Sequence, residues 1–270
     1  MKKTLLTLAM VMVGILSTQA QTLTLSDNYD QVEKINKEAE KGGTRLVRFS
    51  SSRLINQDNW NVLVLPFDVS PIVISKAFGY AAVDVLDESN NVPNTMHFIT
   101  ISSGTIDAGT PFLVHPTSDE GAPTDFQNQV VFSDVVIKKV ESQMVTTDNN
   151  GNRFIGVFSP TTFYGKDFWY MSKGMWKRAS KFTEENPVSL KPFRAYIDMS
   201  NAKSKSAEAQ MIIIDEPDGT TTVIDAATFN KGEFNSNADN GWYTVTGMRL
   251  VDEPTEKGVY IHNARKVIIK

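Results

Sequence analysis

The stretch Phe163 to Arg178, FYGKDFWYMSKGMWKR, decides the fold class. Aromatic residues flank Lys173 and Gly174 on both sides, and this pair suits the tight connection of a β-hairpin. Alternation along the first strand places Phe168 and Tyr170 on one face and Trp169 on the other. The stretch therefore predicts an aromatic hairpin with two different faces.

Segments of the same kind recur on both sides of this hairpin, rich in β-branched and aromatic residues and separated by turn-forming residues. The predicted strands before residue 215, including the first strand of the hairpin, are Val62 to Phe67, Met96 to Ile101, Phe112 to His115, Val130 to Val140, Phe154 to Phe158, Phe168 to Ser172, Phe193 to Met199 and Met211 to Ile214. Many short strands at this spacing are typical of a sandwich or barrel. We therefore expect an all-β protein with a β-sandwich-like body.

Two short peripheral helices interrupt this pattern. Asp27 to Lys41 has an amphipathic spacing, with Asp27 or Asn28 placed to cap it. Pro71 to Phe78 follows Ser70, a good N-cap, and begins with the residue that suits a first helical position.

The N-terminus predicts export. Two lysines precede an apolar run from Leu5 to Leu16 and a small-residue stretch that ends at Ala20. This is the layout of a signal peptide, so we expect residues 1–20 to be removed. The apolar run is too short to span a bilayer, and no later segment is long and apolar enough, so we expect no transmembrane segment after cleavage.

Composition excludes several classes of function. The chain has no cysteine, which removes disulfides and thiolate chemistry. Its net charge is −4, and loss of the two signal lysines makes it about −6, so nucleic acid is not an expected partner. The roughly 250 mature residues suffice for one large β domain with a small appendage.

The domain organisation follows from a change in character near the C-terminus. We expect a β-sandwich-like module over residues 21–224, a polar linker over 225–240 and a small β tail over 241–270. Thirty residues bury too little surface to be very stable alone, so the tail is expected to serve in recognition or attachment.

The tail carries Gly241 to Leu250, GWYTVTGMRL, and Lys257 to Ile261, KGVYI, before a basic terminal strand. It resembles the sorting domains that the type IX secretion system handles in Bacteroidota. The resemblance implies delivery to the outer surface or the medium, although the periplasm stays open. The residues that carry it are Gly247, Arg249, Gly258 and Tyr260.

The body carries five motifs, which are WNVLVLPF from Trp60, the pair Phe78 and Gly79, IDAGTPFLV from Ile106, FIGVFSP from Phe154 and FRAY from Phe193. Together they resemble a recurring, largely uncharacterised β module of secreted Bacteroidota proteins. That family supplies no catalytic residues to carry over, and we expect the chain not to be an enzyme.

The aromatic hairpin is the most suggestive candidate for ligand binding. Trp169, Tyr170 and Trp176 would stack on sugar rings or anchor a protein partner if they were exposed, and would fill the core if they were buried. Binding of a glycan requires Trp169 or Trp176 to lie at the surface.

Candidate catalytic groups are sparse. The three histidines are far apart and lack zinc-site spacing, so no metal or cofactor is expected. Asp84, Asp87 and Glu88 form the densest carboxylate cluster of the body, and we interpret it as a solvated turn. A glycoside hydrolase would need two carboxylates facing each other across a groove, and this is the least favoured hypothesis.

Two further features are interpreted as structural. Asp148 to Asn152 is a loop tip with a single carboxylate, too few oxygen charges for calcium. Arg194 is expected to form a salt bridge with a buried carboxylate, and contact with an anionic ligand is the alternative.

These observations predict a non-enzymatic exported protein that serves in adhesion or interaction at the cell envelope. The partner is an unidentified protein or glycan, and the alternative function is glycan binding through the aromatic hairpin around Trp169 and Trp176.

Overall fold

A computed structural model describes most of the body and parts of the tail. The described residues are 21–49, 59–79, 81–116, 130–203, 210–216, 219–225, 242–244, 249–250, 253–255, 257–262 and 265–269. The expected signal peptide lies outside them, as does the expected linker from residue 226 onward.

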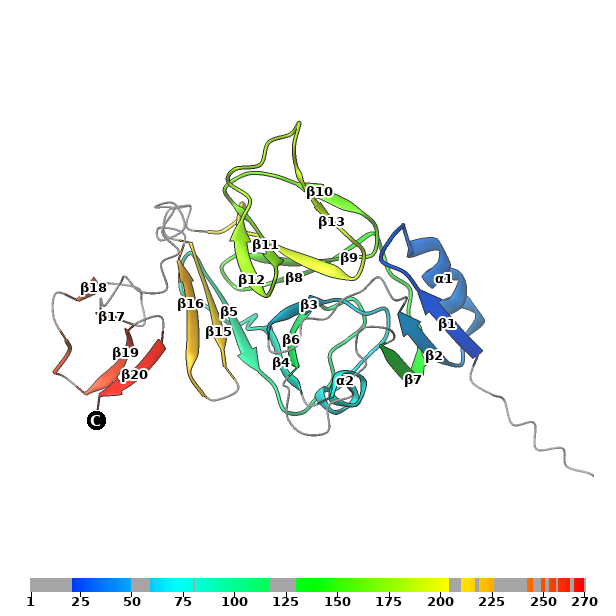
Figure 1. The fold of residues 1–270 in the computed structure, drawn as a ribbon, viewed down its shortest axis with the longest axis horizontal. Helices are drawn as coiled ribbons and strands as arrows, with labels where there is room; N and C mark the ends of the chain where they lie inside the picture. The colour runs from blue at the N-terminus through cyan, green and yellow to red at the C-terminus, as the bar shows by residue number, and fades with distance from the viewer. Residues whose placement is uncertain are drawn as a thin grey trace, which may run out of the picture.

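Two large sheets form the body (Figure 1). The five-stranded sheet has the order β12 (Met175–Arg178), β11 (Phe168–Ser172), β14 (Arg194–Asp198), β9 (Arg153–Val157), β8 (Gln143–Thr147). The six-stranded sheet has the order β16 (Thr221–Asp225), β15 (Met211–Asp215), β5 (Thr95–Thr100), β4 (Ala81–Leu86), β6 (Phe112–Pro116), β3 (Asn61–Leu63). Their facing surfaces enclose a shared apolar core, which confirms the expected sandwich-like, all-β fold.

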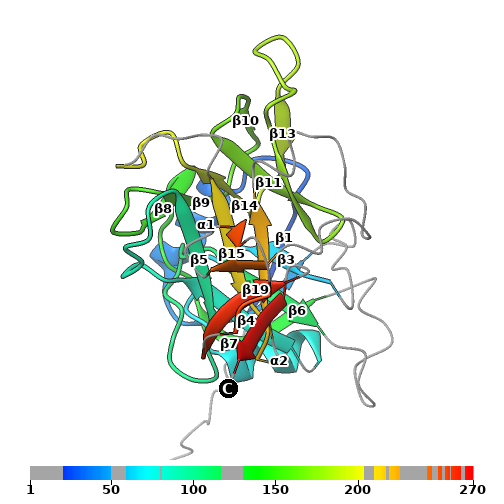
Figure 2. The same ribbon diagram turned by 90° about the vertical axis from the view of Figure 1, so that its left-hand side faces the viewer.

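Smaller sheets cover the outer sides of this sandwich. β1 (Gln21–Leu25), β2 (Thr44–Phe49) and β7 (Val131–Val136) form a three-stranded sheet beside the six-stranded one. β10 (Thr161–Phe163) and β13 (Val188–Leu190) pair above the far face of the five-stranded sheet (Figures 1 and 2). One apolar cluster lies between the three-stranded and six-stranded sheets, and another lies between the five-stranded sheet and the β10–β13 pair. Because the core of the sandwich covers its other face, the five-stranded sheet is covered on both faces.

Two helices pack against the cluster between the three-stranded and six-stranded sheets. α2 (Pro71–Phe78) has the predicted bounds, because the Ser70 hydroxyl accepts a hydrogen bond from the Val73 amide at 3.4 Å and Pro71 occupies the first position. α2 buries Ile74 and Phe78 in this cluster.

α1 (Val32–Lys41) begins five residues later than the sequence predicts, and neither Asp27 nor Asn28 caps it. The side chain of Gln31 holds the preceding loop, since its Oε1 accepts from the Ser26 amide at 3.2 Å. The Gln31 amide itself donates to the carbonyl of Phe158 at 3.1 Å. This docking of the loop on the body is a tertiary contact that helical periodicity does not reveal.

The tail forms a four-stranded sheet of its own, with the order β18 (Arg249–Leu250), β17 (Trp242–Thr244), β19 (Gly258–His262), β20 (Arg265–Ile269). It lies at the opposite end of the long axis from β1 (Figure 1). β16 ends at Asp225, so the body extends to the first residue of the expected linker.

Candidate functional site

The aromatic hairpin does not form an exposed platform. Its strands pair through the predicted turn at Lys173 and Gly174, whose φ angles of 55° and 74° match a tight hairpin connection. Trp169 is 0 % exposed and Trp176 is 1 % exposed, because both point into the core between the two large sheets. This burial removes the surface that glycan stacking on Trp169 or Trp176 requires.

Tyr170 lies on the other face of the hairpin, as strand alternation predicts, and is half-buried. Its ring meets Phe163 at 6.3 Å and Phe182 at 5.9 Å between ring centroids. Burial raises the pKa of the Tyr170 hydroxyl. All three aromatic candidates are therefore packed against other side chains, which corrects the ligand-binding hypothesis for this hairpin.

The loop tip at Asp148 is structural, but its side chains are less exposed than a loop tip suggests. Asp148 Oδ1 accepts from the backbone amides of Asn150 and Asn152, both at 2.9 Å, and all three residues are buried. Burial raises the pKa of Asp148, and these hydrogen bonds oppose the shift.

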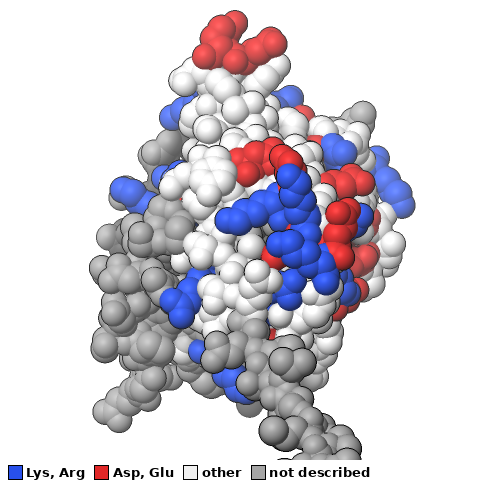
Figure 3. Space-filling model, turned by 90° about the vertical axis from the view of Figure 1, so that its right-hand side faces the viewer, with Lys and Arg blue, Asp and Glu red and all other residues white. Residues whose placement is uncertain are grey.

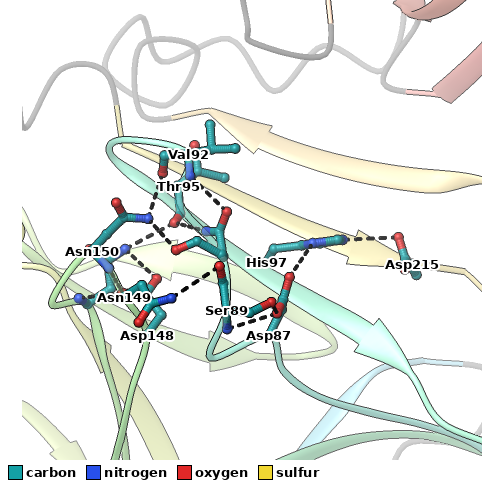
Figure 4. Close-up of polar contacts among 11 residues, drawn as sticks. Asp87, Ser89, Val92, Thr95, His97, Asp148, Asn149, Asn150 and Asp215 are labelled. Carbon is teal, nitrogen blue, oxygen red and sulfur yellow. Dashed lines mark hydrogen bonds and ion pairs between the residues drawn. The ribbon is translucent and has the colours of Figure 1, made fainter.

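This turn docks on the loop between β4 and β5 (Figure 4). Asn150 Nδ2 donates to the carbonyls of Asn90 and Val92 at 2.8 and 2.9 Å, and Asn152 Nδ2 donates to the carbonyl of Thr95 at 3.0 Å. These bonds join the two large sheets at one end of the sandwich. We call it the loop-docked end.

Polar side chains of the five-stranded sheet are also paired at the loop-docked end. Arg153 at the start of β9 forms an ion pair with Asp198 at the end of β14. Trp169 Nε1 donates to Gln210 Oε1 at 3.0 Å, and Gln210 Nε2 donates to Asp167 Oδ1 at 3.0 Å. These buried polar groups are held by partners from neighbouring strands, whereas Asn152 Oδ1 and Arg153 Nε have no hydrogen-bond partner within the described residues.

His97 connects this region to the last strands of the sheet (Figure 4). Its Nδ1 lies 3.6 Å from Asp87 Oδ2 and its Nε2 lies 3.3 Å from Asp215 Oδ1. Because β15 runs parallel to β5, residues 118 positions apart meet at this histidine. Asp87 is therefore a partner of His97, and only part of the expected carboxylate cluster is a solvated turn.

The opposite end of the sandwich has a different character. It gathers Trp60, Asp84, His115, Arg194 and Glu216, and we call it the Trp60 end. Trp60 connects the group, because its Nε1 donates to Glu216 Oε2 at 3.2 Å while its ring lies 5.2 Å from that of His115.

Asp84 is the most unusual carboxylate of the body. It is 0 % exposed, lies between Thr100 and Leu113 in the sheet, and in the described part of the chain neither of its oxygens has a hydrogen bond of ordinary geometry. Burial raises the pKa of Asp84 to about 7, opposed by the nearby Thr100 hydroxyl and reinforced by the charges of Asp215 and Glu216. The interpretation of Asp84 as part of a solvated turn is wrong.

A sequence signal for Asp84 did exist. It stands in the apolar run Ala81 to Leu86, AAVDVL, where period-two alternation aligns it with Ala82 and Leu86. Both of these neighbours belong to the core between the sheets. Glu216 had no such signal, since it reaches the site only through the parallel pairing of β15 with β5.

A cavity of about 40 Å³ opens at the Trp60 end, where β3 meets the turn of the aromatic hairpin. Gly174 permits this close approach, because a Cβ there would lie 2.7 Å from the Cβ of Asn59. The cavity walls include Trp60, Asn61, Val62, Lys173, Leu190 and Arg194.

Arg194 stands out among the arginines of the body. In the part of the chain that the structure describes, its half-buried guanidinium makes no hydrogen bond and no ion pair. Other arginines do have partners, which are Glu38 for Arg45, Asp198 for Arg153 and the Lys166 carbonyl for Arg178. A buried carboxylate, Asp27, does act electrostatically on Arg194, as expected, but no close ion pair of Arg194 is formed within the described residues.

Burial lowers the pKa of Arg194, and the negative charge of Asp27 acts in the opposite direction. The Trp60 end thus places a desolvated cation in the wall of a cavity.

The face that carries α1 contains both positive and negative side chains (Figure 3). Lysine and arginine side chains gather there beside carboxylates (Figure 3). The ion pairs are Lys37 with Glu33 at 2.6 Å, Lys41 with Glu38 at 2.7 Å and Lys139 with Glu40 at 2.9 Å. Because these lysines have partners, the face gives no reason to expect an anionic polymer.

The tail residues are only partly described. Gly247 lies outside the described residues, Arg249 begins β18, and Gly258 and Tyr260 belong to β19. A Cβ on Gly258 would lie 3.1 Å from Cε2 of Tyr260, so a larger residue would press against that ring.

Within the described ranges, no group of three or more histidine and carboxylate side chains is arranged to hold a metal. No helix among those residues is long and apolar enough to cross a membrane. Comparisons with protein-family models, with curated proteins and with solved structures found no match to this chain. The resemblance to secreted β modules and sorting tails stays a prediction.

Proposed function

We propose that this protein is a non-enzymatic interaction module that acts outside the cytoplasm, at the cell envelope or in the medium. The sandwich body would bind the partner, a protein or a glycan. Residues 241–270 would serve as the sorting or attachment tail.

The observation that carries this proposal is the separate strand pairing of the tail sheet. In the described part of the chain, β17 to β20 pair only with one another, and none of their residues belongs to the three apolar clusters of the body. β20 contacts the body at β16, the edge strand of the six-stranded sheet. A segment with this placement can be removed without opening a body core. That property suits a tail that is read and cleaved during export.

A second observation favours binding over catalysis. Asp84 has the pKa of about 7 that would suit proton transfer near neutral pH, yet its side chain is fully enclosed. A general acid must come within hydrogen-bond distance of its substrate, and a carboxyl with no exposed surface does not.

The test compares the full chain with a variant that ends at residue 240, both produced in a bacterium with a type IX secretion system. Mass spectrometry reads both termini in periplasm, outer membrane and medium. We expect the full chain at the surface or in the medium, beginning at Gln21 and lacking residues 241–270.

We expect the shortened variant to stay in the periplasm with an unchanged melting temperature, which separates a sorting defect from a folding defect. Full-length protein found only in the periplasm, with its C-terminus intact at Lys270, would contradict the proposal.

A further inference from the structure

The wall of the cavity at the Trp60 end contains a charged side chain that makes no hydrogen bond within the described residues. Arg194 carries five N–H donors, is half-buried and has no hydrogen-bond or ion-pair partner among the described residues. Buried charges in proteins are nearly always paired, because removing an ion from water costs several kcal/mol unless a counter-charge compensates. The charge of Asp27 compensates that of Arg194 in part, but the N–H donors of the guanidinium stay unused within the described residues, and these donors point to a ligand.

We propose that this cavity binds a carboxylate group, with the guanidinium of Arg194 as its principal partner. The inference goes beyond the proposed function and concerns the body alone, so it holds whether or not the tail directs export.

The chemistry of the walls favours a carboxylate. A guanidinium presents two parallel N–H groups that match the two oxygens of a carboxylate. Lys173, exposed on the hairpin turn, also lines the cavity and adds a second positive charge. Val62, Leu190 and Met171 supply apolar wall, which strengthens a charge-assisted hydrogen bond by excluding water.

The size of the cavity limits what enters. About 10–15 Å³ is needed for one water molecule, so the volume of about 40 Å³ holds roughly three water molecules. A carboxylate group has three heavy atoms, whereas a phosphate has five. The remainder of a larger ligand would stay outside.

The position of Arg194 is fixed by the fold. It is the first residue of β14, opposite Val157 of β9, and follows Phe193, which is fully buried with a φ of 65°. The Phe193 carbonyl also accepts from the Val64 amide of the six-stranded side at 3.3 Å. Backbone contacts on both sides therefore hold the arginine at the junction of the two sheets.

The experiment is an NMR titration of the full mature chain at pH 7 and constant ionic strength. The probes are acetate, glucuronate, phosphate and chloride, and the observed signals are the backbone amides of Asn61, Lys173 and Ala195. We expect saturable shifts with acetate at all three amides and at least fivefold weaker binding of phosphate and chloride.

The two carboxylate probes identify the source of the group. Shifts with acetate alone would indicate a short free acid, and shifts with both would indicate a carboxylate at the end of a larger molecule. Either result supports the site.

Variants of similar volume supply the controls. Arg194→Met is expected to weaken acetate binding at least tenfold and Lys173→Met two- to fivefold, while Lys177→Met, outside the cavity walls, is expected to leave it unchanged. Because Lys173 is exposed, its variant tests the site even if Arg194→Met does not fold.

The proposal is overturned if acetate produces no saturable shift at these amides. Equal shifts from chloride would also overturn it, because they would indicate general screening of charge. Unchanged acetate binding in both Arg194→Met and Lys173→Met would do the same.

Discussion

The two ends of the β9–β14 ladder carry one arginine each, and the two are treated differently. Arg153 stands opposite Asp198 and forms an ion pair with it, whereas Arg194 stands opposite Val157 and has no such partner in the described chain. The same strand pair thus contains one arginine with an ion-pair partner and one without such a partner within the described residues. Local strand geometry therefore does not supply a partner for Arg194.

The difference extends across both sheets. At the loop-docked end, Asn150 and Asn152 tie loops together through hydrogen bonds to backbone carbonyls. At the Trp60 end, Asp84 is buried without a hydrogen bond of ordinary geometry, and Arg194 is desolvated. Side-chain hydrogen bonds therefore connect the sheets at the first end, whereas two desolvated ionisable groups at the second end lack such bonds within the described residues.

The largest expected effect comes from Asp84→Asn. The folded-state pKa of about 7 exceeds the usual value of 3.8, so the folded state holds a proton that the unfolded state has released between these pH values. Wild-type stability therefore falls as pH rises from 4 to 7, by up to about 4 kcal/mol.

Asparagine cannot ionise, so the stability of the variant relative to wild type should rise by a similar amount between pH 4 and pH 8 in urea unfolding. If the unfolding free energies of the two proteins changed with pH in the same way, ionisation of Asp84 would not be the cause of the loss of stability.

A smaller effect is expected at the loop-docked end. Asn150→Ala removes two hydrogen bonds and leaves the carbonyls of Asn90 and Val92 without these donors. The expected loss of unfolding free energy is about 2 kcal/mol, without the pH dependence of Asp84→Asn. A loss below 0.5 kcal/mol would mean that this end is not fastened by the asparagines.

The smallest effect calibrates the comparison at a site away from both ends. Ser70→Ala removes the N-cap of α2 and should cost about 1 kcal/mol in the same urea experiment. Ser70→Gly serves as its control, because glycine at this position is expected to cost only a few tenths of a kcal/mol.

Local chemistry predicts part of this structure well. Ser70 and Pro71 define the start of α2, and the turn at Lys173 and Gly174 with alternating aromatic residues defines the hairpin. These features depend on neighbours within a few residues. Alternation also assigns Trp169 and Tyr170 to opposite faces, but it does not say that both faces are covered.

The candidate site depends on long-range pairing, which explains why the sequence did not reveal it. Trp60, Asp84 and Glu216 meet because β3, β4 and β15 belong to one sheet, and the hairpin turn reaches the cavity from the other sheet. The sequence singles out Arg194 but does not name the carboxylate that acts on it, Asp27, because spacing does not show which carboxylate a buried arginine meets.

The most direct test of the difference between the two ends compares Arg153→Met with Arg194→Met by urea unfolding at pH 7 without added anions. Arg153→Met leaves the buried Asp198 without its ion-pair partner and should lose about 3 kcal/mol. Arg194→Met replaces a desolvated cation with an apolar side chain, so its stability should be unchanged or rise by about 1 kcal/mol. A loss from Arg194→Met as large as that from Arg153→Met would contradict the account, because Arg194 would then be a structural residue.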